Sequence, residues 1–231
     1  PTRRSSDLPA GRGSMSVETT TTLMNLSLIF KHRNIDYSFV SVSNAEVGTA
    51  RNILAAHFLA STHDKFIGID DDIGVEIAVL ERLLDHEADF LAVYQPQRTL
   101  DLNAFEAAIL SGKSGRSAQY AAAPFVGTAS NPINPEYGSI GKVQFIGTGF
   151  YILKKVVLES IVDQGIALSM ITKMPNFSQT THGFFNNVTD DELGHLSEDY
   201  SFCTRVTRAG FEIHAYLGPG VSHTGPMTFQ S

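Results

Sequence analysis

The chain has 231 residues, of which 42% are hydrophobic and 18% charged, and its formal net charge is −7. This composition excludes a disordered chain and is typical of one globular domain with a substantial core. The negative charge argues against a general basic surface for nucleic acid. Cys203 is the single cysteine, so an intramolecular disulfide is excluded, and no apolar run approaches the ~18 residues of a membrane span. We therefore expect a cytoplasmic protein with no nucleic-acid partner.

The first eight residues, PTRRSSDL, need separate treatment. They are the translation of CCT ACA CGA CGC TCT TCC GAT CT, which resembles the end of a common sequencing-library adapter. We interpret residues 1–8 as read-through at the edge of an incomplete gene assembled from genomic or metagenomic reads, and the alternative is a natural basic leader. On this interpretation the true N-terminus, with any signal or anchor, is missing.

Strands and helices alternate in the first half of the chain. Aromatic and β-branched runs predict strands at 37–42, 66–69 and 90–94, and apolar residues at helical spacing predict helices at 16–31, 48–61 and 74–89. This alternation indicates βαβ units. We expect one α/β domain over residues 9–231, with an open, mostly parallel, twisted sheet and helices on both faces.

The second half is less regular. Residues 95–142 are rich in Ala, Gly, Ser and Pro and predict a long excursion, after which 143–153 returns as a strand. Weak periodicity at 165–197 is typical of binding loops or lids. The last predicted helix begins at Ser197 and ends before Gly210, and a final strand follows it.

Three consecutive carboxylates follow the strand predicted at 66–69. In an open parallel sheet, ligands bind at the carboxyl ends of strands. Residues two apart in an extended segment point to the same side, so Asp70 and Asp72 can converge on one cation while Asp71 turns away. Carboxylate oxygens suit magnesium or manganese. The alternative is a solvated acidic turn that caps the next helix.

Four sequence blocks carry a resemblance to nucleotide-sugar glycosyltransferases of the GT-A type, in particular to short stand-alone members of the family 2 group that includes cellulose and chitin synthases. The blocks are TARNILAAHFL at 49–59, KFIGIDDDI at 65–73, FIGTGFYILKK at 145–155, and SEDYSFCTRVTRAGFEI with VSHTG between 197 and 225. The resemblance implies a GT-A, Rossmann-like fold. It implies metal-dependent transfer of a sugar from a nucleoside diphosphate sugar to an acceptor hydroxyl, with inversion as the expected outcome. The chain has no tryptophan, so it lacks the Q-x-x-R-W signature of processive synthases, and transfer of a single sugar is expected.

By this resemblance, Asp70 and Asp72 are the D-x-D that holds Mn²⁺ or Mg²⁺ on the donor diphosphate. Asp72 is the direct ligand, and Asp70 contacts the ribose or a metal-bound water. His223 matches a histidine that completes the metal site in some GT-A enzymes, and its alternative is a surface or core histidine.

Glu198 and Asp199 match the acidic pair on the acceptor side of these enzymes. In inverting relatives, a carboxylate there takes the proton of the acceptor hydroxyl. We expect Asp199 to be this base, with Glu198 as the second choice. The same two residues also satisfy the pattern of an ordinary acidic N-terminal cap.

The glycine-rich segment Gly147, Thr148 and Gly149 matches a loop that comes close to the transferred sugar, because glycine removes the side chain that would block approach. Its alternative is a β-bulge or a tightly packed strand. Arg51 matches an arginine that lines the donor pocket. It can instead pin Asp70 or Asp71 by a charged hydrogen bond.

Two departures from the family pattern limit the assignment of the donor. The family's first strand, which holds the nucleotide base and ribose, is missing or replaced before Pro9, and the chain ends six residues after Gly225, where a closing segment is often found. The donor base, the acceptor (glycan, lipid or protein) and the oligomeric state are therefore left open. The rival functions are a sugar-phosphate nucleotidyltransferase and a non-catalytic carbohydrate-binding relative.

Overall fold

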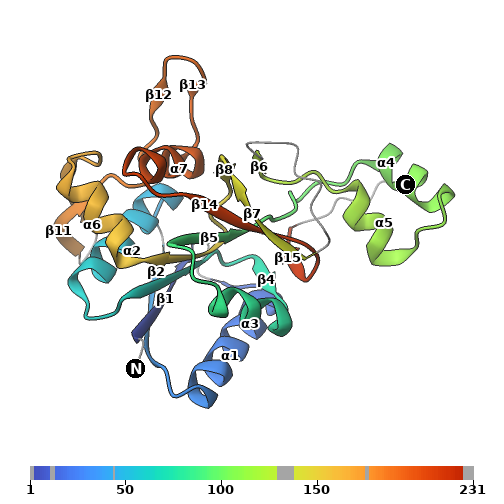
Figure 1. Ribbon diagram of the computed structural model, residues 1–231, viewed down its shortest axis with the longest axis horizontal. Helices are drawn as coiled ribbons and strands as arrows, with labels where there is room; N and C mark the ends of the chain where they lie inside the picture. The colour runs from blue at the N-terminus through green and yellow to red at the C-terminus, as the bar shows by residue number, and fades with distance from the viewer. Residues whose placement is uncertain (1–2, 11–13, 44, 129–137, 175–176, 226–231) are drawn as a thin grey trace.

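The computed structural model describes residues 3–10, 14–43, 45–128, 138–174 and 177–225. Its centre is a seven-stranded sheet in the order β2-β1-β3-β9-β5-β14-β7 (Figure 1). The strands are β1 (Arg3–Ala10), β2 (Asp36–Ser43), β3 (Lys65–Ile69), β5 (Phe90–Val93), β7 (Ser139–Val143), β9 (Phe150–Lys154) and β14 (Ile213–Leu217). Strands β9 and β7 run antiparallel to their neighbours, and the other strands share one direction. The predicted α/β class with a mostly parallel open sheet is confirmed.

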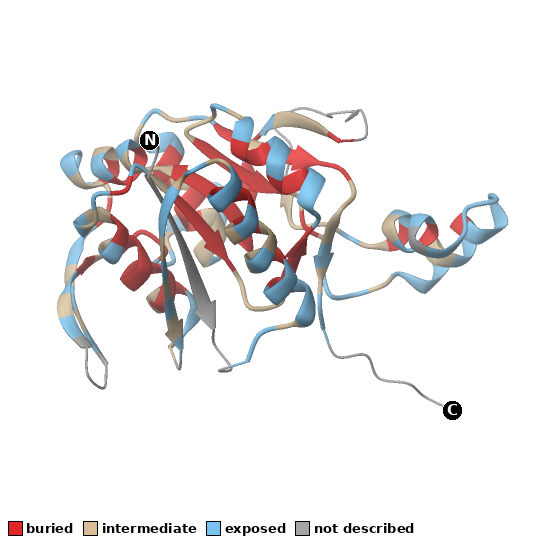
Figure 2. Ribbon diagram, turned by 90° about the horizontal axis from the view of Figure 1, so that it is seen from below, coloured by how far each residue is buried: buried red, intermediate tan, exposed pale blue. Residues whose placement is uncertain are grey.

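Helices cover both faces of this sheet. They are α1 (Val17–His32), α2 (Val47–Ala60), α3 (Ile77–Asp85), α6 (Lys155–Asp163) and α7 (Glu198–Arg208). Helices α2, α6 and α7 share one apolar core, which includes Phe58 and Phe202, and α1 and α3 share the other, which includes Phe30 and Leu80. Buried residues gather on the strands and on the helix sides that face them (Figure 2). Because the central strands are buried on both faces, they read as continuous apolar runs.

Local signals explain where the helices begin and end. The Ser16 hydroxyl accepts from the Thr19 N–H at 3.0 Å at the start of α1. Ser197 caps α7 in the same way by accepting from the Tyr200 N–H. Gly210 follows α7 with a φ of 91°, a left-handed conformation that favours glycine. The predicted start and end of this helix are confirmed.

The long excursion of the second half contains two helices, α4 (Leu102–Leu110) and α5 (Gly115–Ala122). We call residues 102–122 the α4–α5 arm, because they project from the end of the sheet in both views (Figures 1 and 2). Strand β6 (Gly127–Thr128) then returns to pair with β8 (Phe145–Ile146). Residues 129–137 lie outside the described residues.

Three predicted segments differ from the structure. The helix predicted at 74–89 is shorter, because residues Ile73–Val75 form strand β4 and helix α3 spans only Ile77–Asp85. The strand predicted at 143–153 is divided into β8 and β9, and helix α6, which the sequence analysis did not predict, follows β9 directly. The region predicted as loops contains two antiparallel hairpins, β10 (Ser169–Met174) with β11 (Phe177–His182) and β12 (Thr189–Asp190) with β13 (Gly194–His195). These hairpins lie outside the main sheet and are largely exposed, so no apolar alternation marks them in the sequence.

The N-terminal strand occupies a position between β2 and β3 and runs parallel to both. We expected the family's first strand to be missing or replaced before Pro9, and the backbone of residues 3–10 forms a strand beside β3. Strand pairing does not test the origin of these residues. The interpretation of residues 1–8 as adapter read-through stays a prediction.

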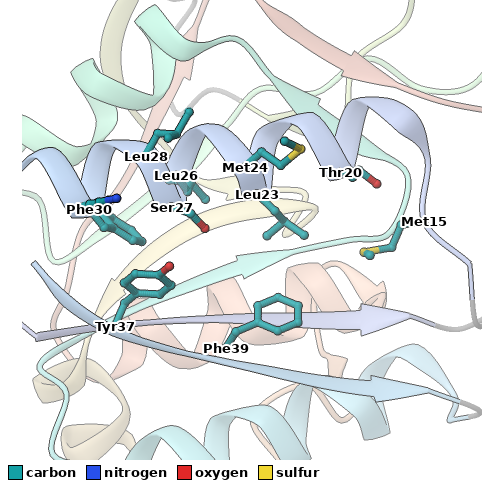
Figure 3. Close-up of a pocket in the computed structure, with 11 residues that line it drawn as sticks. Met15, Thr20, Leu23, Met24, Leu26, Ser27, Leu28, Phe30, Tyr37 and Phe39 are labelled. Atoms are coloured by element: carbon teal, nitrogen blue, oxygen red, sulfur yellow. The ribbon is translucent and has the colours of Figure 1, made fainter.

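Two further features complete the description. No helix in the described ranges has the length and apolar content needed to cross a bilayer. An apolar groove lies between α1 and β2, where Phe30 and Leu23 of the helix point toward Tyr37 and Phe39 of the strand (Figure 3). Its described lining contains none of the predicted site residues.

Candidate active site

The acidic turn, residues Asp70 to Asp72, lies where β3 ends, at the carboxyl edge of the sheet. Backbone hydrogen bonds hold it from two sides. The Asp70 N–H donates to the Gly149 carbonyl at 2.7 Å, and the Thr224 N–H donates to the Asp72 carbonyl at 2.8 Å. Strand β4 (Ile73–Val75), which follows the turn, pairs antiparallel with β15 (Val221–His223). The fold therefore brings the segments around residues 149 and 223 to the turn.

Arg51 joins the acidic turn to the acidic pair of α7. Its Nη2 donates to both Asp70 carboxylate oxygens, at 3.0 and 2.8 Å, and its Nη1 donates to Asp199 Oδ1 at 2.7 Å. Glu198 lies 3.5 Å from the same Nη1, and the Arg51 side chain is only 4% exposed. Of the two roles considered for Arg51, the geometry shows the charged hydrogen bond, and it is made to Asp70, with no bond to Asp71.

The charges of this cluster do not balance, since one guanidinium faces three carboxylates. The pKa of Asp70 is raised to about 6, mainly by burial. Arg51 acts to lower this pKa, and the neighbouring charges of Asp199 and Asp72 act to raise it. Burial opposes the charge of Arg51, but Asp70 and Asp199 together raise the pKa of Arg51. The surplus of negative charge favours a cation at this edge of the sheet.

The glycine-rich segment supports the proposed base. The hydroxyl of Thr148, which is fully buried, donates to Asp199 Oδ1, the oxygen that Arg51 also binds. No described residue donates to Asp199 Oδ2, and the Asp199 side chain is 16% exposed. A Cβ at position 149 would lie 2.2 Å from Gln95 Oε1. A side chain at position 149 would therefore have to displace the Gln95 carboxamide, which the sequence analysis did not single out.

His223 faces Asp72, the last carboxylate of the acidic turn. Its Nε2 lies 3.3 Å from Asp72 Oδ1, and its Nδ1 lies 2.8 Å from the Pro96 carbonyl oxygen. A carbonyl only accepts, so the hydrogen-bond partner assigns a proton to Nδ1. Burial opposes protonation, but the bonds to Asp72 and Pro96 outweigh it and raise the pKa of His223. Arg98 donates to the other Asp72 oxygen at 2.9 Å.

The carboxylate of Asp72 and the imidazole of His223 fit a divalent metal ion that also binds the phosphate groups of a substrate. Among the described residues, no group of three or more His, Cys, Asp and Glu side chains is arranged to hold a metal. Asp72 Oδ1 and His223 Nε2 nevertheless offer an oxygen and a nitrogen at one point, and the bond to Pro96 fixes the imidazole orientation. Magnesium sites commonly use one or two protein ligands and complete their coordination with substrate phosphates and water. The structure brings Asp72 and His223 together, whereas both Asp70 oxygens bond to Arg51.

The loop at residues 185–186 contacts Arg51 and its neighbour Asn52, and the sequence analysis did not predict it. Asn52 accepts from the Phe185 N–H at 2.9 Å and donates to Asn186 Oδ1 at 2.8 Å. Arg205 donates to the Asn186 carbonyl at 2.7 Å, and the Phe185 ring lies 5.6 Å from the Arg51 guanidinium. The only available signal was the position of Asn52 directly after Arg51, because the other contacts depend on tertiary packing.

Comparisons with known proteins give distant likenesses. No family model and no curated protein matches the chain. The chain is similar to the solved structure of A197 from STIV, with 16% identity, 97% of this chain and 86% of that chain covered, and a TM-score of 0.48. It is also similar to a UDP-glucose pyrophosphorylase complexed with UDP-glucose (12% identity, 97% and 92% covered, TM-score 0.44). A third likeness is to a glycosyltransferase involved in glycosylation of the major capsid of PBCV-1 (11% identity, 72% and 65% covered, TM-score 0.35). All three TM-scores lie below 0.5, so the functional proposal rests on the site's geometry.

Proposed function

We propose that this chain is a metal-dependent glycosyltransferase that moves one sugar from a nucleoside diphosphate sugar to an acceptor hydroxyl with inversion. The observation that carries the proposal is the arrangement around the acidic turn. On one side Asp70 shares Arg51 with Asp199, and on the other Asp72 faces His223. A candidate base and a candidate cation site therefore lie at the same edge of the sheet.

Asp72 and His223 are the residues that would hold Mn²⁺ or Mg²⁺. When bound, the ion neutralises the charge of the departing diphosphate. Arg98 holds the second Asp72 oxygen and so orients the carboxylate toward His223. Asp70 keeps Arg51 in place, and through Arg51 it positions Asp199.

Asp199 would act as the general base. Arg51 and Thr148 fix its Oδ1, which leaves Oδ2 to accept the proton of the acceptor hydroxyl. As the acceptor oxygen bonds to the anomeric carbon, the bond from that carbon to the diphosphate breaks, and the electron pair leaves with the diphosphate. Assistance of this kind contributes ~10²–10⁴ in rate. Glu198, at 3.5 Å from the same guanidinium, is the second choice.

The test is turnover of sugar nucleotides with added Mn²⁺ in wild type, Asp72→Ala and Asp199→Asn. We expect Asp72→Ala to lose the response to Mn²⁺, and Asp199→Asn to lower kcat by ~10²–10⁴ with little change in the donor KM. Asp163→Asn is the control, because Asp163 is exposed at the end of α6. Wild-type activity in Asp72→Ala would contradict the metal assignment. Release of pyrophosphate from a nucleoside triphosphate and a sugar phosphate would instead indicate a nucleotidyltransferase, and saccharide binding without turnover would indicate a binding protein.

A further inference from the structure

Gln95 has a buried carboxamide oxygen that finds no hydrogen-bond donor among the described residues. It lies two residues after the end of β5 and is only 5% exposed. Its Oε1 is buried, and among the residues that the structure describes none donates to it. Buried acceptors are almost always paired, because an unpaired one loses its bonds to water and gains nothing in return. A ligand hydroxyl would supply the missing donor.

The carboxamide of Gln95 packs against the glycine-rich segment of the candidate site. A Cβ at Gly149 would lie 2.2 Å from Gln95 Oε1, and a Cβ at Gly147 would lie 3.1 Å from its Nε2. The residue between these glycines bonds to Asp199 through its hydroxyl. The residue after Gln95 in the chain, Pro96, bonds to His223 through its backbone carbonyl.

We infer that Gln95 binds the transferred sugar, with its carboxamide hydrogen-bonded to a hydroxyl of that sugar, and that it determines donor specificity. The inference rests on the proposed function. In an in-line displacement the sugar lies between the departing diphosphate and the base, and Gln95 adjoins both the glycine-rich segment that bonds to Asp199 and the residue that bonds to His223. A carboxamide both donates and accepts, which matches a hydroxyl. A site built to bond a hydroxyl discriminates strongly against donors that lack it.

The melting temperature of a Gln95 variant shows whether this side chain serves ligand binding or holds the fold together. Gln95→Leu keeps a similar volume and removes the unpaired acceptor, so we expect its melting temperature to equal or exceed that of wild type. The matched control is Asn52→Leu. Asn52 is 2% exposed and its carboxamide is bonded at both ends, so this variant should melt at a lower temperature.

The second readout is the affinity for sugar nucleotides, measured by titration calorimetry in the presence of Mn²⁺. The probes are UDP-glucose, UDP-N-acetylglucosamine and GDP-mannose, with UDP and GDP as the sugar-free ligands. We expect Gln95→Leu to weaken binding of the sugar nucleotide about tenfold and to leave the affinity for the nucleoside diphosphate within about twofold, since one hydrogen bond to the sugar is lost. Gln164→Leu, at an exposed residue that follows α6, should match wild type with every probe.

Gly149→Ala provides an independent variant, because its methyl group would displace the far end of the Gln95 side chain. We expect a similar loss for the sugar nucleotide, and a Gln95→Leu/Gly149→Ala double variant that loses no more than either single one.

Three results would overturn the inference. Equal sugar-nucleotide affinity in wild type and Gln95→Leu would overturn it and leave the proposed glycosyltransferase standing. A lower melting temperature with equal losses for both kinds of ligand would assign Gln95 to the fold. Wild type that binds no sugar nucleotide and no nucleoside diphosphate would overturn the proposed function, and this inference with it.

Discussion

Arg51 is the side chain on which the arrangement of the site depends, because it holds carboxylates from two distant segments. Replacing it with methionine would leave Asp70 and Asp199 close together without their shared cation. Removal of one partner of a buried ion pair is strongly destabilising, so we expect Arg51→Met to lower the free energy of unfolding by about 3 kcal/mol in urea denaturation.

The matched control is Arg33→Met. Arg33 pairs with Asp85 at the surface, where the aspartate side chain is 65% exposed. An exposed pair contributes at most about 1 kcal/mol, because water screens it. Equal losses in the two variants would contradict the view that Arg51 compensates buried charge.

Cys203 gives a prediction about pH. Burial raises the pKa of its thiol from 9.0 to about 12. Between these values the unfolded chain releases the proton and the folded chain keeps it, so stability falls as the pH rises through this window. From pH 9 to pH 10 we expect wild type to lose up to about 1.4 kcal/mol more than Cys203→Ala in the free energy of unfolding.

A thiol reagent provides the second measurement for Cys203. At pH 8 the buried, protonated thiol should react slowly in the folded protein and at the ordinary rate once urea unfolds it. Rapid labelling of the folded protein, or identical pH dependence in wild type and Cys203→Ala, would contradict the burial of this thiol.

At the scale of elements, α1 fixes the strand that follows the acidic turn. The Thr22 hydroxyl accepts from the buried Val75 N–H at 2.8 Å, and that of Thr19 donates to the Ile73 carbonyl at 2.9 Å. Thr22→Val keeps the shape of the side chain but leaves the Val75 N–H unpaired.

We expect Thr22→Val to lower the free energy of unfolding by about 1–3 kcal/mol. Thr21→Val is the control on the same helix, because the exposed Thr21 hydroxyl bonds only to the Val17 carbonyl of its own helix. Its effect should stay within about 0.5 kcal/mol. Similar thermal melts for the two variants would show that this contact does not hold β4.

At the scale of the whole molecule, the α4–α5 arm is separable from the body. Among the arm residues whose side chains the structure describes, none belongs to either apolar core. The chain enters and leaves the arm at one place, where the Asp101 N–H donates to the Ala122 carbonyl at 3.1 Å and the Gln97 N–H donates to the Pro124 carbonyl at 2.7 Å.

Joining Asp101 to Ala122 through two glycines should therefore give a folded protein. We expect its melting temperature to stay within a few degrees of wild type, since the buried apolar surface of the two cores is unchanged. Loss of cooperative unfolding in the shortened chain would show that the arm belongs to the core. The same deletion applied to α6, whose Val157, Leu158 and Ile161 are buried, should abolish folding.

The sequence was informative where a segment carries a clear apolar pattern. Apolar runs and helical spacing placed β2, α2, β3 and β5 to within a residue or two, because each packs against an apolar core, and β3 and β5 do so with nearly every residue. The hairpins β10–β11 and β12–β13 were missed because they are exposed and impose no such pattern. Helix α6 was missed although its buried residues Val157, Leu158 and Ile161 have helical spacing.

The sequence by itself determined the α/β class, the acidic turn at the end of β3, and the caps of α7, because periodicity and capping act over a few neighbouring residues. Tertiary structure alone decided that Arg51 holds Asp199, 148 positions away, and that Gln95 packs against Gly149. These contacts follow from strand order and from the packing of helices on the sheet. No local pattern encodes them, since each partner has an ordinary sequence environment of its own.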